Sequence, residues 1–546
     1  MNNALTRENI IDILEKRIAG FKNGYRQNIA LIGQRQIGKT AIIHELISEI
    51  DKTNILPVSI KINGRGIAQI INSFARQIVN EFLLSQGIHP ESYIKAPAGQ
   101  NQLSEILKKA QAFIPKTVAK IHAASGMLAK NKTEAAILGM FEILEIFHSE
   151  TAKPCLIIVD EFQDLINFGG EEIFKELSKL IVLQKSAMYI ITSSCPSRAK
   201  EILAHSLSLL FGNFEVLEVA PYHALAAYEF IARNLPVKIE DDHKKFLVDF
   251  TFGHPFYMDK FCREILSLAK ISASGKVSGD ILITAFENLL FKEWGVLNRR
   301  FLSLLNDSCC NKSREDFIDV ILSISCGCNK IKLITKNLNK AEKIVRQKIS
   351  RLVETEMLAK NGDFLRFSDK VFGFWIKTVY APRQELDALD EESHRIAFRN
   401  SITCAFDNFS ASLRRDTIER MLELLKLFQN ESIQIERNKL LLSQFDEIKV
   451  ISAHPKKFEA TILAKSSGSF WVIGIKNGVL LPEDITEFTS ASRQYGNMRS
   501  QRRLIISLSS IDVNAKLKAL QEKIMTWEKE TLNSLLELYN QPAIFS

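Results

Sequence analysis

Runs of consecutive apolar residues alternate with helical patterns in residues 1–220. Four of these runs have the length of a strand, and the one that begins at Pro154 is continuously apolar, as a parallel strand buried on both faces is. They lie at Asn28–Ile32, Leu56–Ile62, Pro154–Val159 and Met188–Thr192. Apolar side chains recur with the helical period over 6–19, before the first run, and over 66–86 and much of 101–149, between later runs. Strands that alternate with helices predict a parallel sheet with helices on both faces.

The pattern changes after residue 220. Residues 221–290 are mostly helical in pattern. Residues 291–383 combine two amphipathic helices with a turn and a short strand at Phe364–Phe367. Helix–turn–helix followed by a hairpin is the layout of a winged helix. The sequence therefore predicts a helical region and then a small winged-helix module.

Residues 384–546 begin with helices and then show strand patterns. The strands are expected at 458–464, 470–476 and 503–508, and a closing helix is expected over 513–539. This part is predicted to be a second α/β domain.

Length and composition exclude several classes of protein. A chain of 546 residues that is 46% hydrophobic and 25% charged is an ordinary globular protein with about three or four domains. No apolar run reaches the roughly 18 residues that a membrane crossing needs. The N-terminus lacks the layout of a signal peptide, so a cytoplasmic protein without a membrane partner is expected. Eight cysteines in so long a chain are not a disulfide framework.

The first apolar run leads into a loop with two glycines, Gly33-Gln34-Arg35-Gln36-Ile37-Gly38-Lys39-Thr40. Gly33 and Gly38 allow the loop to curl so that its backbone N–H groups point at phosphate oxygens, and the following helix directs its positive end to the same place. Lys39 is expected to bridge the β- and γ-phosphates, and the Thr40 hydroxyl to ligate Mg²⁺. The pattern predicts a nucleotide site, and the alternative is a glycine-rich turn without a ligand.

Acids and hydroxyls follow two of the other runs. Asp160 is expected to hold the hydration shell of Mg²⁺, and Glu161 to polarise the water that attacks the γ-phosphate. Alone, these acids could be a solvated strand end, but pairing with the phosphate loop favours the catalytic interpretation. Thr192 or Ser193 could sense the γ-phosphate or orient the water, although Thr-Ser-Ser is also ordinary turn chemistry.

The positive charge is concentrated in one segment. Between Lys330 and Arg351, eight basic residues stand against one acid, a net charge of +7 compared with +8 for the whole chain. A helix there can reach phosphates and base edges in a major groove. The candidate DNA contacts are Lys343, Arg346, Lys348 and Arg351. The alternative is a solvated helix whose lysines keep it soluble.

With these motifs, the chain before residue 384 resembles the archaeal-type ATPase family, in the STAND branch of P-loop NTPases, which is related to AAA+ proteins. The resemblance rests on Arg7-Glu8, the phosphate loop, Val159-Asp160-Glu161-Phe162-Gln163, Ser193-Ser194 and Gly253-His254-Pro255-Phe256. It implies an α/β fold with a RecA- or AAA-like core over 1–220, a helical lid over 221–290 and a winged helix over 291–383.

The same resemblance assigns His254 and Pro255 to the nucleotide site. In the family, the Gly-x-Pro segment packs near the nucleotide and couples its state to the lid. Taken alone, the segment is a turn that starts a helix. Before Glu215–Val219 the family often has Gly-Arg, whereas this chain has Gly212-Asn213. Arg198 is a candidate substitute for that charge, or a solvated arginine at a helix start.

Several members of the family carry a further domain similar to PD-(D/E)xK nucleases, and residues 364–375 resemble the link into it. That chemistry needs an acid and then Glu-x-Lys on adjacent strands. Glu459 fits the first acid and Lys476 the lysine, but Gly474 stands where the second metal-binding acid is required. Residues 384–546 are therefore expected to be nuclease-like in fold and inactive.

Together these features predict an ATP-binding protein, a slow Mg²⁺-dependent ATPase that acts as a nucleotide-dependent switch. Double-stranded DNA is the expected partner of the winged helix, and a homo-oligomer is a further expectation. One alternative is a DNA-binding or regulatory module in which ATP is mainly structural. Another is a protein-interaction scaffold whose winged helix contacts a protein partner.

Overall fold

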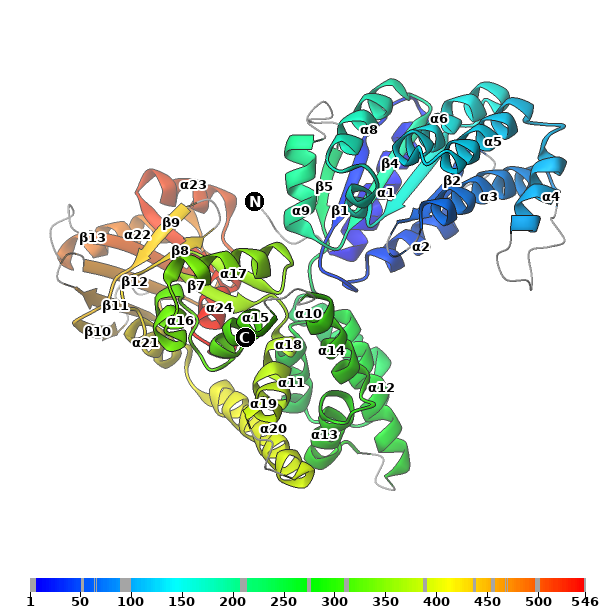
Figure 1. Ribbon diagram of the computed structural model, residues 1–546. Coiled ribbons are helices and arrows are strands. Elements are labelled where there is room, and N and C mark those ends of the chain that lie inside the picture. Colours follow the sequence, from blue (N-terminus) through cyan, green and yellow to red (C-terminus); the bar gives the residue numbers. More distant parts are fainter. Residues whose placement is uncertain are drawn as a thin grey trace. The chain divides into compact units, whose positions relative to one another are not determined.

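The structure is a computed structural model whose elements are shown in Figure 1. It describes residues 6–50, 54–62, 64, 66–88, 100–206, 214–272, 276–308, 314–385, 390–435, 438–452, 457–466, 468, 470–495 and 501–544. The chain forms two compact units, one of Met1–Tyr222 with His254–Phe256 and one of His223–Gly253 with Tyr257–Ser546. Gly212 and Asn213, where the chain departs from the family pattern, lie outside the described residues.

The first unit contains a five-stranded parallel sheet, which confirms the predicted α/β fold. Its strand order is β2-β3-β4-β1-β5. The strands are β1 (Asn28–Ile32), β2 (Leu56–Lys61), β3 (Cys155–Asp160), β4 (Ala187–Ser193) and β5 (Phe214–Glu218). Because β4 lies between β1 and β3, the carboxyl ends of these three strands are neighbours at one edge of the sheet.

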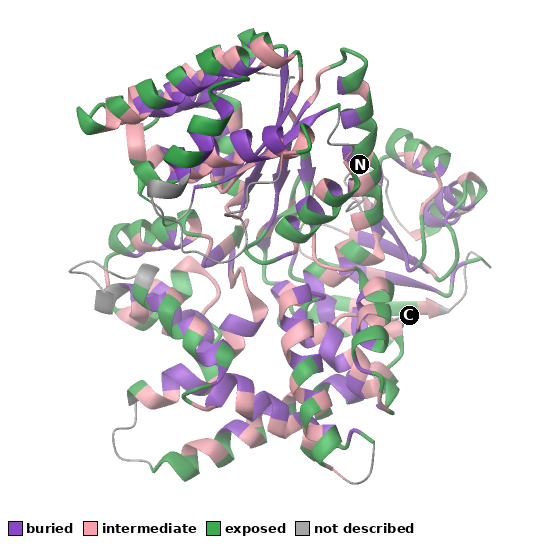
Figure 2. Cartoon of the chain, turned by 90° about the vertical axis from the view of Figure 1, so that its right-hand side faces the viewer, coloured by how far each residue is buried: buried purple, intermediate pink, exposed green. Residues whose placement is uncertain are grey.

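Helices cover both faces of this sheet, whose strands are largely buried (Figures 1 and 2). Alternate side chains of a strand point to opposite faces. Ile29 and Leu31 of β1 pack with the helices α1 (Arg7–Lys22) and α2 (Lys39–Glu49). Ala30 and Ile32 belong to a second core. The helices of that core are α3 (Ile67–Ser85), α4 (Gln100–Ala110), α5 (Pro115–Ala129), α6 (Thr133–Thr151) and α8 (Glu172–Leu183).

Helices form the first part of the second unit, as the sequence predicts. They are α10 (Ala224–Asn234), α11 (Asp241–Thr251), α12 (Pro255–Ile271), α13 (Gly279–Phe286), α14 (Val296–Ser308), α18 (Lys370–Trp375), α19 (Ala381–Glu385) and α20 (Glu391–Arg414). Phenylalanine rings join them: Phe250 of α11 lies 4.7 Å from Phe286 and 5.1 Å from Phe374, centroid to centroid. Arg399 of α20 pairs at 2.7 Å with the buried Glu287. The helix α20 therefore packs on helices that precede the predicted boundary at residue 384.

Three helices and a hairpin make up the basic region. They are α15 (Arg314–Ser325), α16 (Ile331–Leu338), α17 (Glu342–Glu354) and the antiparallel strands β6 (Leu358–Asn361) and β7 (Phe364–Phe367). Asn339, with φ of 48°, allows the turn between α16 and α17. The sequence pattern predicted two of these helices and missed the short α16.

A mixed sheet forms the last part of the chain, in the order β10-β11-β12-β13-β14. Its strands are β10 (Glu447–Ser452), β11 (Ala460–Lys465), β12 (Phe470–Lys476), β13 (Gln501–Ser507) and β14 (Ile524–Glu528). The first three are antiparallel, and β12, β13 and β14 are parallel. The other elements are α21 (Thr417–Lys426), α22 (Pro482–Ser492), α23 (Val513–Gln521), α24 (Lys529–Leu538) and the hairpin β8 (Glu431–Ile435) and β9 (Asn438–Leu442).

The single closing helix predicted over 513–539 is wrong. The strand β14 separates α23 from α24 and pairs with β13. Lys523, with φ of 55°, follows α23, and the side chains of Ile524 and Trp527 are buried. Pairing with a neighbouring strand outweighs the helical pattern there. Among the residues that the structure describes, no helix combines the length and apolar character that a membrane crossing requires.

Candidate functional site

The loop between β1 and α2 favours glycine at both motif positions, at Gly33 because of close packing and at Gly38 because of its backbone conformation. A Cβ at Gly33 would lie 2.6 Å from the carbonyl oxygen of Val219. Gly38 has φ of 107°, in the left-handed region, and a Cβ there would lie 2.6 Å from Nη2 of Arg7. Larger residues would therefore force this loop to open.

Lys39 is the first residue of α2, and it is buried with 4% exposure. Its Nζ donates hydrogen bonds to the carbonyl oxygens of Gly33, at 2.7 Å, and Gln34, at 2.9 Å. The ammonium thus lies within the curve of the loop, beside the positive end of α2. This arrangement places a cation where the motif predicts phosphates.

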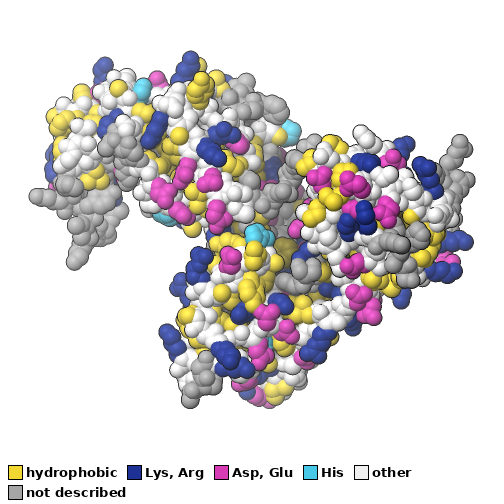
Figure 3. All heavy atoms as spheres, turned by 180° about the vertical axis from the view of Figure 1, so that it is seen from behind, with side chains coloured by type: hydrophobic (Ala, Val, Ile, Leu, Met, Phe, Trp, Pro, Cys, Tyr) yellow, Lys and Arg dark blue, Asp and Glu magenta, His cyan; other side chains and the backbone are white. Residues whose placement is uncertain are grey.

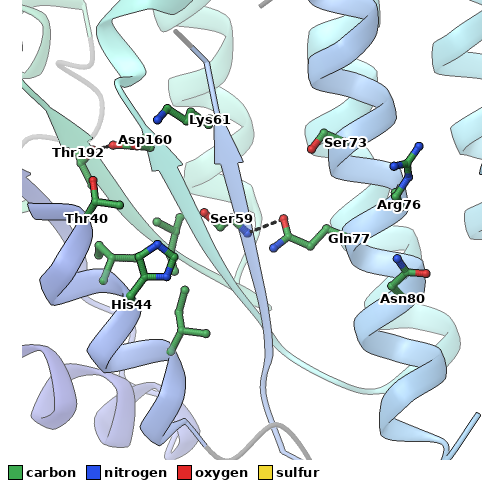
Figure 4. A pocket seen from close by; sticks show the side chains of 13 residues that line it. Thr40, His44, Ser59, Lys61, Ser73, Arg76, Gln77, Asn80, Asp160 and Thr192 are labelled. Carbon is green, nitrogen blue, oxygen red and sulfur yellow. Dashed lines mark hydrogen bonds between the residues drawn. The ribbon is translucent and has the colours of Figure 1, made fainter. Parts of the chain in front are cut away.

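Thr40, Asp160 and Thr192 line one cavity of about 440 Å³ (Figure 4). They come from the start of α2 and the ends of β3 and β4. The Thr192 hydroxyl donates a hydrogen bond of 2.5 Å to Oδ1 of Asp160, which fixes that carboxylate. A hydroxyl and a carboxylate are oxygen donors of the kind that Mg²⁺ prefers, so Thr40 and Asp160 fit the predicted metal role.

Glu161 follows Asp160 and is held by three donors. Its Oε2 accepts hydrogen bonds from Nε2 of Gln163 at 2.7 Å, from the backbone N–H of Ser194 at 2.9 Å and from the Ser194 hydroxyl at 2.7 Å. Glu161 itself has φ of 58°, in the left-handed region. The sequence predicted Glu161 as the residue that polarises water. It did not identify Gln163 and Ser194 as the residues that hydrogen-bond to the Glu161 carboxylate. Gln163 and Ser194 do stand beside the two motif strands in the sequence.

The structure separates the two hydroxyls proposed as sensors. Thr192 faces the cavity, whereas Ser193 is fully buried and its hydroxyl donates to the carbonyl oxygen of Cys195 and accepts from its N–H. Consecutive strand residues point to opposite faces, so only one of the two can reach the site. Of this pair, Thr192 therefore fits the sensing role better, and Ser193 shapes the turn after β4.

Arg7 supports the phosphate loop from α1. Its guanidinium donates to the carbonyl oxygen of Ile37 and stacks 4.1 Å from the ring centroid of Tyr222. Burial lowers the pKa of this guanidinium from its ordinary value. In the sequence, Arg7 carried no role beyond its part in the family resemblance.

His254 and Pro255 are buried and, with Phe256, cluster with the first unit, although the chain up to Gly253 and from Tyr257 belongs to the second. Pro255 is the first residue of α12, as expected of a turn that starts a helix. Arg198, the candidate substitute for the family's arginine, pairs with Glu201 at 2.6 Å and Glu171 at 3.3 Å. These ion pairs favour the interpretation of Arg198 as a surface arginine.

The basic segment is partly neutralised by contacts within the chain. Four of its eight cations are engaged: Lys330 with Glu431, Lys340 with Asp319, Arg346 with Glu342, and Lys348 over the ring of Phe317. The exposed side chains of Lys343 and Arg351 on α17 have no hydrogen-bond or ion-pair partner within the described part of the chain. Figure 3 shows the face opposite to that of Figure 1, and on this face Lys and Arg side chains are interspersed with Asp and Glu.

The nuclease-like position Gly474 lies on β12 against two aromatic rings. A Cβ there would lie 2.8 Å from Cε2 of Phe488 and 2.9 Å from Cδ1 of Phe458. Lys476 pairs with the buried Asp484, and Glu459 accepts a hydrogen bond from Asn477. The rings fill the space in which the side chain of a second metal-binding acid would begin.

We therefore expect the purified chain to leave duplex DNA intact in the presence of Mg²⁺. Without a second carboxylate beside Glu459, the metal would lack a ligand that the two-strand chemistry requires. Incubation with linear and supercoiled DNA, followed by gel electrophoresis, measures this. Cleavage that disappears in the Lys476→Ala variant would contradict the expectation.

No family model and no curated protein matches this chain. Solved structures resemble it at low identity. A Walker-type ATPase of Pyrococcus abyssi is 15% identical, with a TM-score of 0.47, over 68% of this chain and 96% of that one. The RuvB Holliday junction branch migration motor of Thermotoga maritima is 14% identical, with a TM-score of 0.33, over 67% and 94%. The Orc1 protein of Aeropyrum pernix, solved in complex with DNA, is 11% identical, with a TM-score of 0.37, over 70% and 95%.

Proposed function

We propose that this chain binds ATP and hydrolyses it slowly with Mg²⁺, and that it works as a nucleotide-dependent switch. The observation that carries the proposal is the convergence of five side chains at the carboxyl edge of one parallel sheet. They are Lys39, Thr40, Asp160, Glu161 and Thr192. Each has the chemistry that phosphate binding, metal binding or water activation needs.

Lys39 exchanges its hydrogen bonds to the two loop carbonyls for bonds to the β- and γ-phosphates. Thr40 and Asp160 would hold Mg²⁺, which would neutralise phosphate charge. Glu161 orients and polarises the attacking water, while Ser194 and Gln163 keep its carboxylate in place. Thr192 orients Asp160 through its hydroxyl.

The switch operates through the segment His254–Pro255. These two residues cluster with the first unit, and the helix α12 that begins at Pro255 continues to Ile271 in the second. A helix is stiff along its axis, so a shift at its first turn moves the rest of it. Nucleotide state thereby biases the position of the helical lid.

ATP turnover by the purified full chain, with and without duplex DNA, tests the proposal. We expect Mg²⁺-dependent release of phosphate that EDTA abolishes. A protein that binds ATP without turnover would favour the alternative in which ATP is structural. A protein that neither binds nor hydrolyses ATP would overturn the proposal.

Duplex DNA is the second ligand that a specific observation favours. The exposed face of α17 carries Lys343 and Arg351, which have no partner within the described residues, together with Arg346. Like charges on one helix repel each other and cost stability, so folding alone does not explain them. Contacts with the phosphates of DNA would explain them.

Replacing both Lys343 and Arg351 with alanine should weaken duplex binding. If each contacts a phosphate, the slope of log affinity against log salt should flatten by about two units, one for each lost contact. Fluorescence anisotropy across a salt series measures this, and ATPase activity without DNA should barely change.

The matched control replaces Lys175 and Lys179, which removes the same charge from α8 of the first unit, where both lysines pair with glutamates. The control should keep the affinity and the slope of the wild type. Unchanged binding by the Lys343→Ala/Arg351→Ala variant would contradict DNA contact by α17 and favour the alternative in which this module contacts a protein.

A further inference from the structure

The cavity that holds Asp160 and Thr192 extends from these strand ends to the outermost strand of the sheet, β2. One wall is α2, with Thr40 and His44, and the other is α3. Residues of β2 and β3 lie between these helices (Figure 4). Only one end of the cavity touches the candidate nucleotide site, so most of its wall has no role in the proposed ATPase.

The α3 wall is polar, although α3 is otherwise an apolar core helix. Its buried side, which includes Ile71, Phe74 and Ile78, belongs to the large core of the first unit. The residues that face the cavity are Ser73, Arg76, Gln77 and Asn80, which recur with the helical period. Gln77 reaches across the cavity edge and accepts a hydrogen bond of 3.0 Å from the backbone N–H of Ser59 on β2.

Asn80 is unusual among these residues because it is only 1% exposed. Its Oδ1 is buried and has no hydrogen-bond partner in the part of the chain that the structure describes. A buried amide left unpaired lowers stability, so native proteins rarely keep one without a ligand or another use for it. An apolar residue would suit the packing of α3 better.

Lys61 gives the cavity its positive character. It is paired in register with Asp160 on the neighbouring strand, and its side chain is exposed (Figure 4). Within the described residues its side-chain ammonium has no ion-pair or hydrogen-bond partner. Arg76 adds a second cation, and Asp160 is the only acid among the described residues that line the cavity.

Size and lining together define a class of ligand. About 440 Å³ is the size of a small-molecule site, and Ile43 and Ile47 offer an apolar side for a carbon skeleton. A lining with more cations than acids favours an anionic ligand such as a phosphate monoester, which carries nearly two negative charges at neutral pH. The Asn80 amide can present its oxygen or its nitrogen and so pair with a hydroxyl group.

We propose that this cavity binds a small phosphate monoester that carries hydroxyl groups, with its phosphate at Lys61 and a hydroxyl at Asn80. This site goes beyond the proposed ATPase, because ATP would lie on the phosphate loop. Its common boundary with that site, at Thr40 and Asp160, would let the ester sense whether nucleotide and metal are present.

The test uses ribose 5-phosphate as the probe and isothermal titration calorimetry as the measurement. The full chain carries Lys39→Ala throughout, so that the phosphate loop does not compete for the probe. We expect saturable binding of ribose 5-phosphate, with much weaker binding of inorganic phosphate and of ribose. Binding of ribose 5-phosphate by the Lys39→Ala protein does not require ATP. This test can therefore fail or succeed independently of the test for ATP hydrolysis.

Two added substitutions locate the binding. Lys61→Ala and Asn80→Leu should each lower the affinity at least about tenfold, since each removes a charged or buried polar contact. Asn80→Leu should also keep or raise the thermal midpoint, because it replaces an unpaired buried amide with an apolar side chain of similar size. The control Lys130→Ala removes an exposed lysine at the end of α5 and should bind like the parent.

Three outcomes would overturn the proposal. They are the absence of ribose 5-phosphate binding, affinity that is unchanged by Lys61→Ala and Asn80→Leu, and inorganic phosphate binding as tightly as the ester. A fall in the thermal midpoint with Asn80→Leu would also count against it, because Asn80 would then be a structural residue.

Discussion

Replacing Lys39 with alanine will remove measurable ATP binding while the fold survives. A hydrogen bond to a charged group is worth about 1.5–3 kcal/mol, so losing contacts to two phosphates should lower the affinity about a hundredfold or more. The loop itself should persist, because Gly33 and Gly38 keep their conformations and α2 keeps its apolar contacts with the sheet. Calorimetric titration with Mg·ATP measures the affinity, and circular dichroism checks the fold.

The matched control for Lys39 is Arg35→Ala. Arg35 is an exposed cation in the same loop, at a position that the motif leaves open. It should change ATP affinity by only a few fold, as expected for an exposed charge. Equal ATP binding by the wild type and Lys39→Ala would show that this loop is a structural turn.

Replacing Glu161 with glutamine should separate ATP binding from hydrolysis. Glutamine keeps the size of the side chain and can still accept from Ser194, but it cannot act as a carboxylate toward water. Turnover should fall by about 10²–10⁴, the usual contribution of a general base, while ATP affinity stays close to that of the wild type. Single-turnover kinetics and a filter-binding assay give the two quantities.

Ser194→Ala is the informative companion to Glu161→Gln. It removes the hydroxyl that holds Oε2 and leaves the backbone N–H bond to the same oxygen. A loosened carboxylate should lower the rate of ATP hydrolysis less than a missing one. The rate of Ser194→Ala should therefore lie between those of the wild type and Glu161→Gln. Wild-type turnover by Glu161→Gln would mean that another residue activates the water.

The sequence predicts the parts of the site that depend on short motifs and continuous burial. The strands β1, β3 and β4 are apolar along nearly their whole length, and a parallel strand with helices on both faces requires that. The roles of the residues in the phosphate loop are predicted from the spacing of its glycines, lysine and threonine alone. The role of Glu161 is predicted because it comes directly after a buried strand that ends in an acid.

Contacts that depend on strand order could not be derived from the sequence. Ser194 reaches Glu161 only because β3 and β4 are neighbours, and no sequence feature near either residue indicates that these strands pair. The polar side of α3 resembles the solvent face of any amphipathic helix until the cavity beside it is seen. In the same way, β14 keeps a helix-like pattern, and its strand form comes from pairing with β13.

The two rings beside Gly474 also limit how this domain could change by mutation. A carboxylate at position 474 is more than one substitution away, because Phe458 or Phe488 must also become smaller to accommodate it. Adding the acid first overpacks the core at a cost of about 1–3 kcal/mol, and shrinking a ring first leaves a void at a cost of about 3–5 kcal/mol. Either order of steps passes through a less stable protein, so selection for stability would oppose the gain of metal-dependent cleavage in this domain.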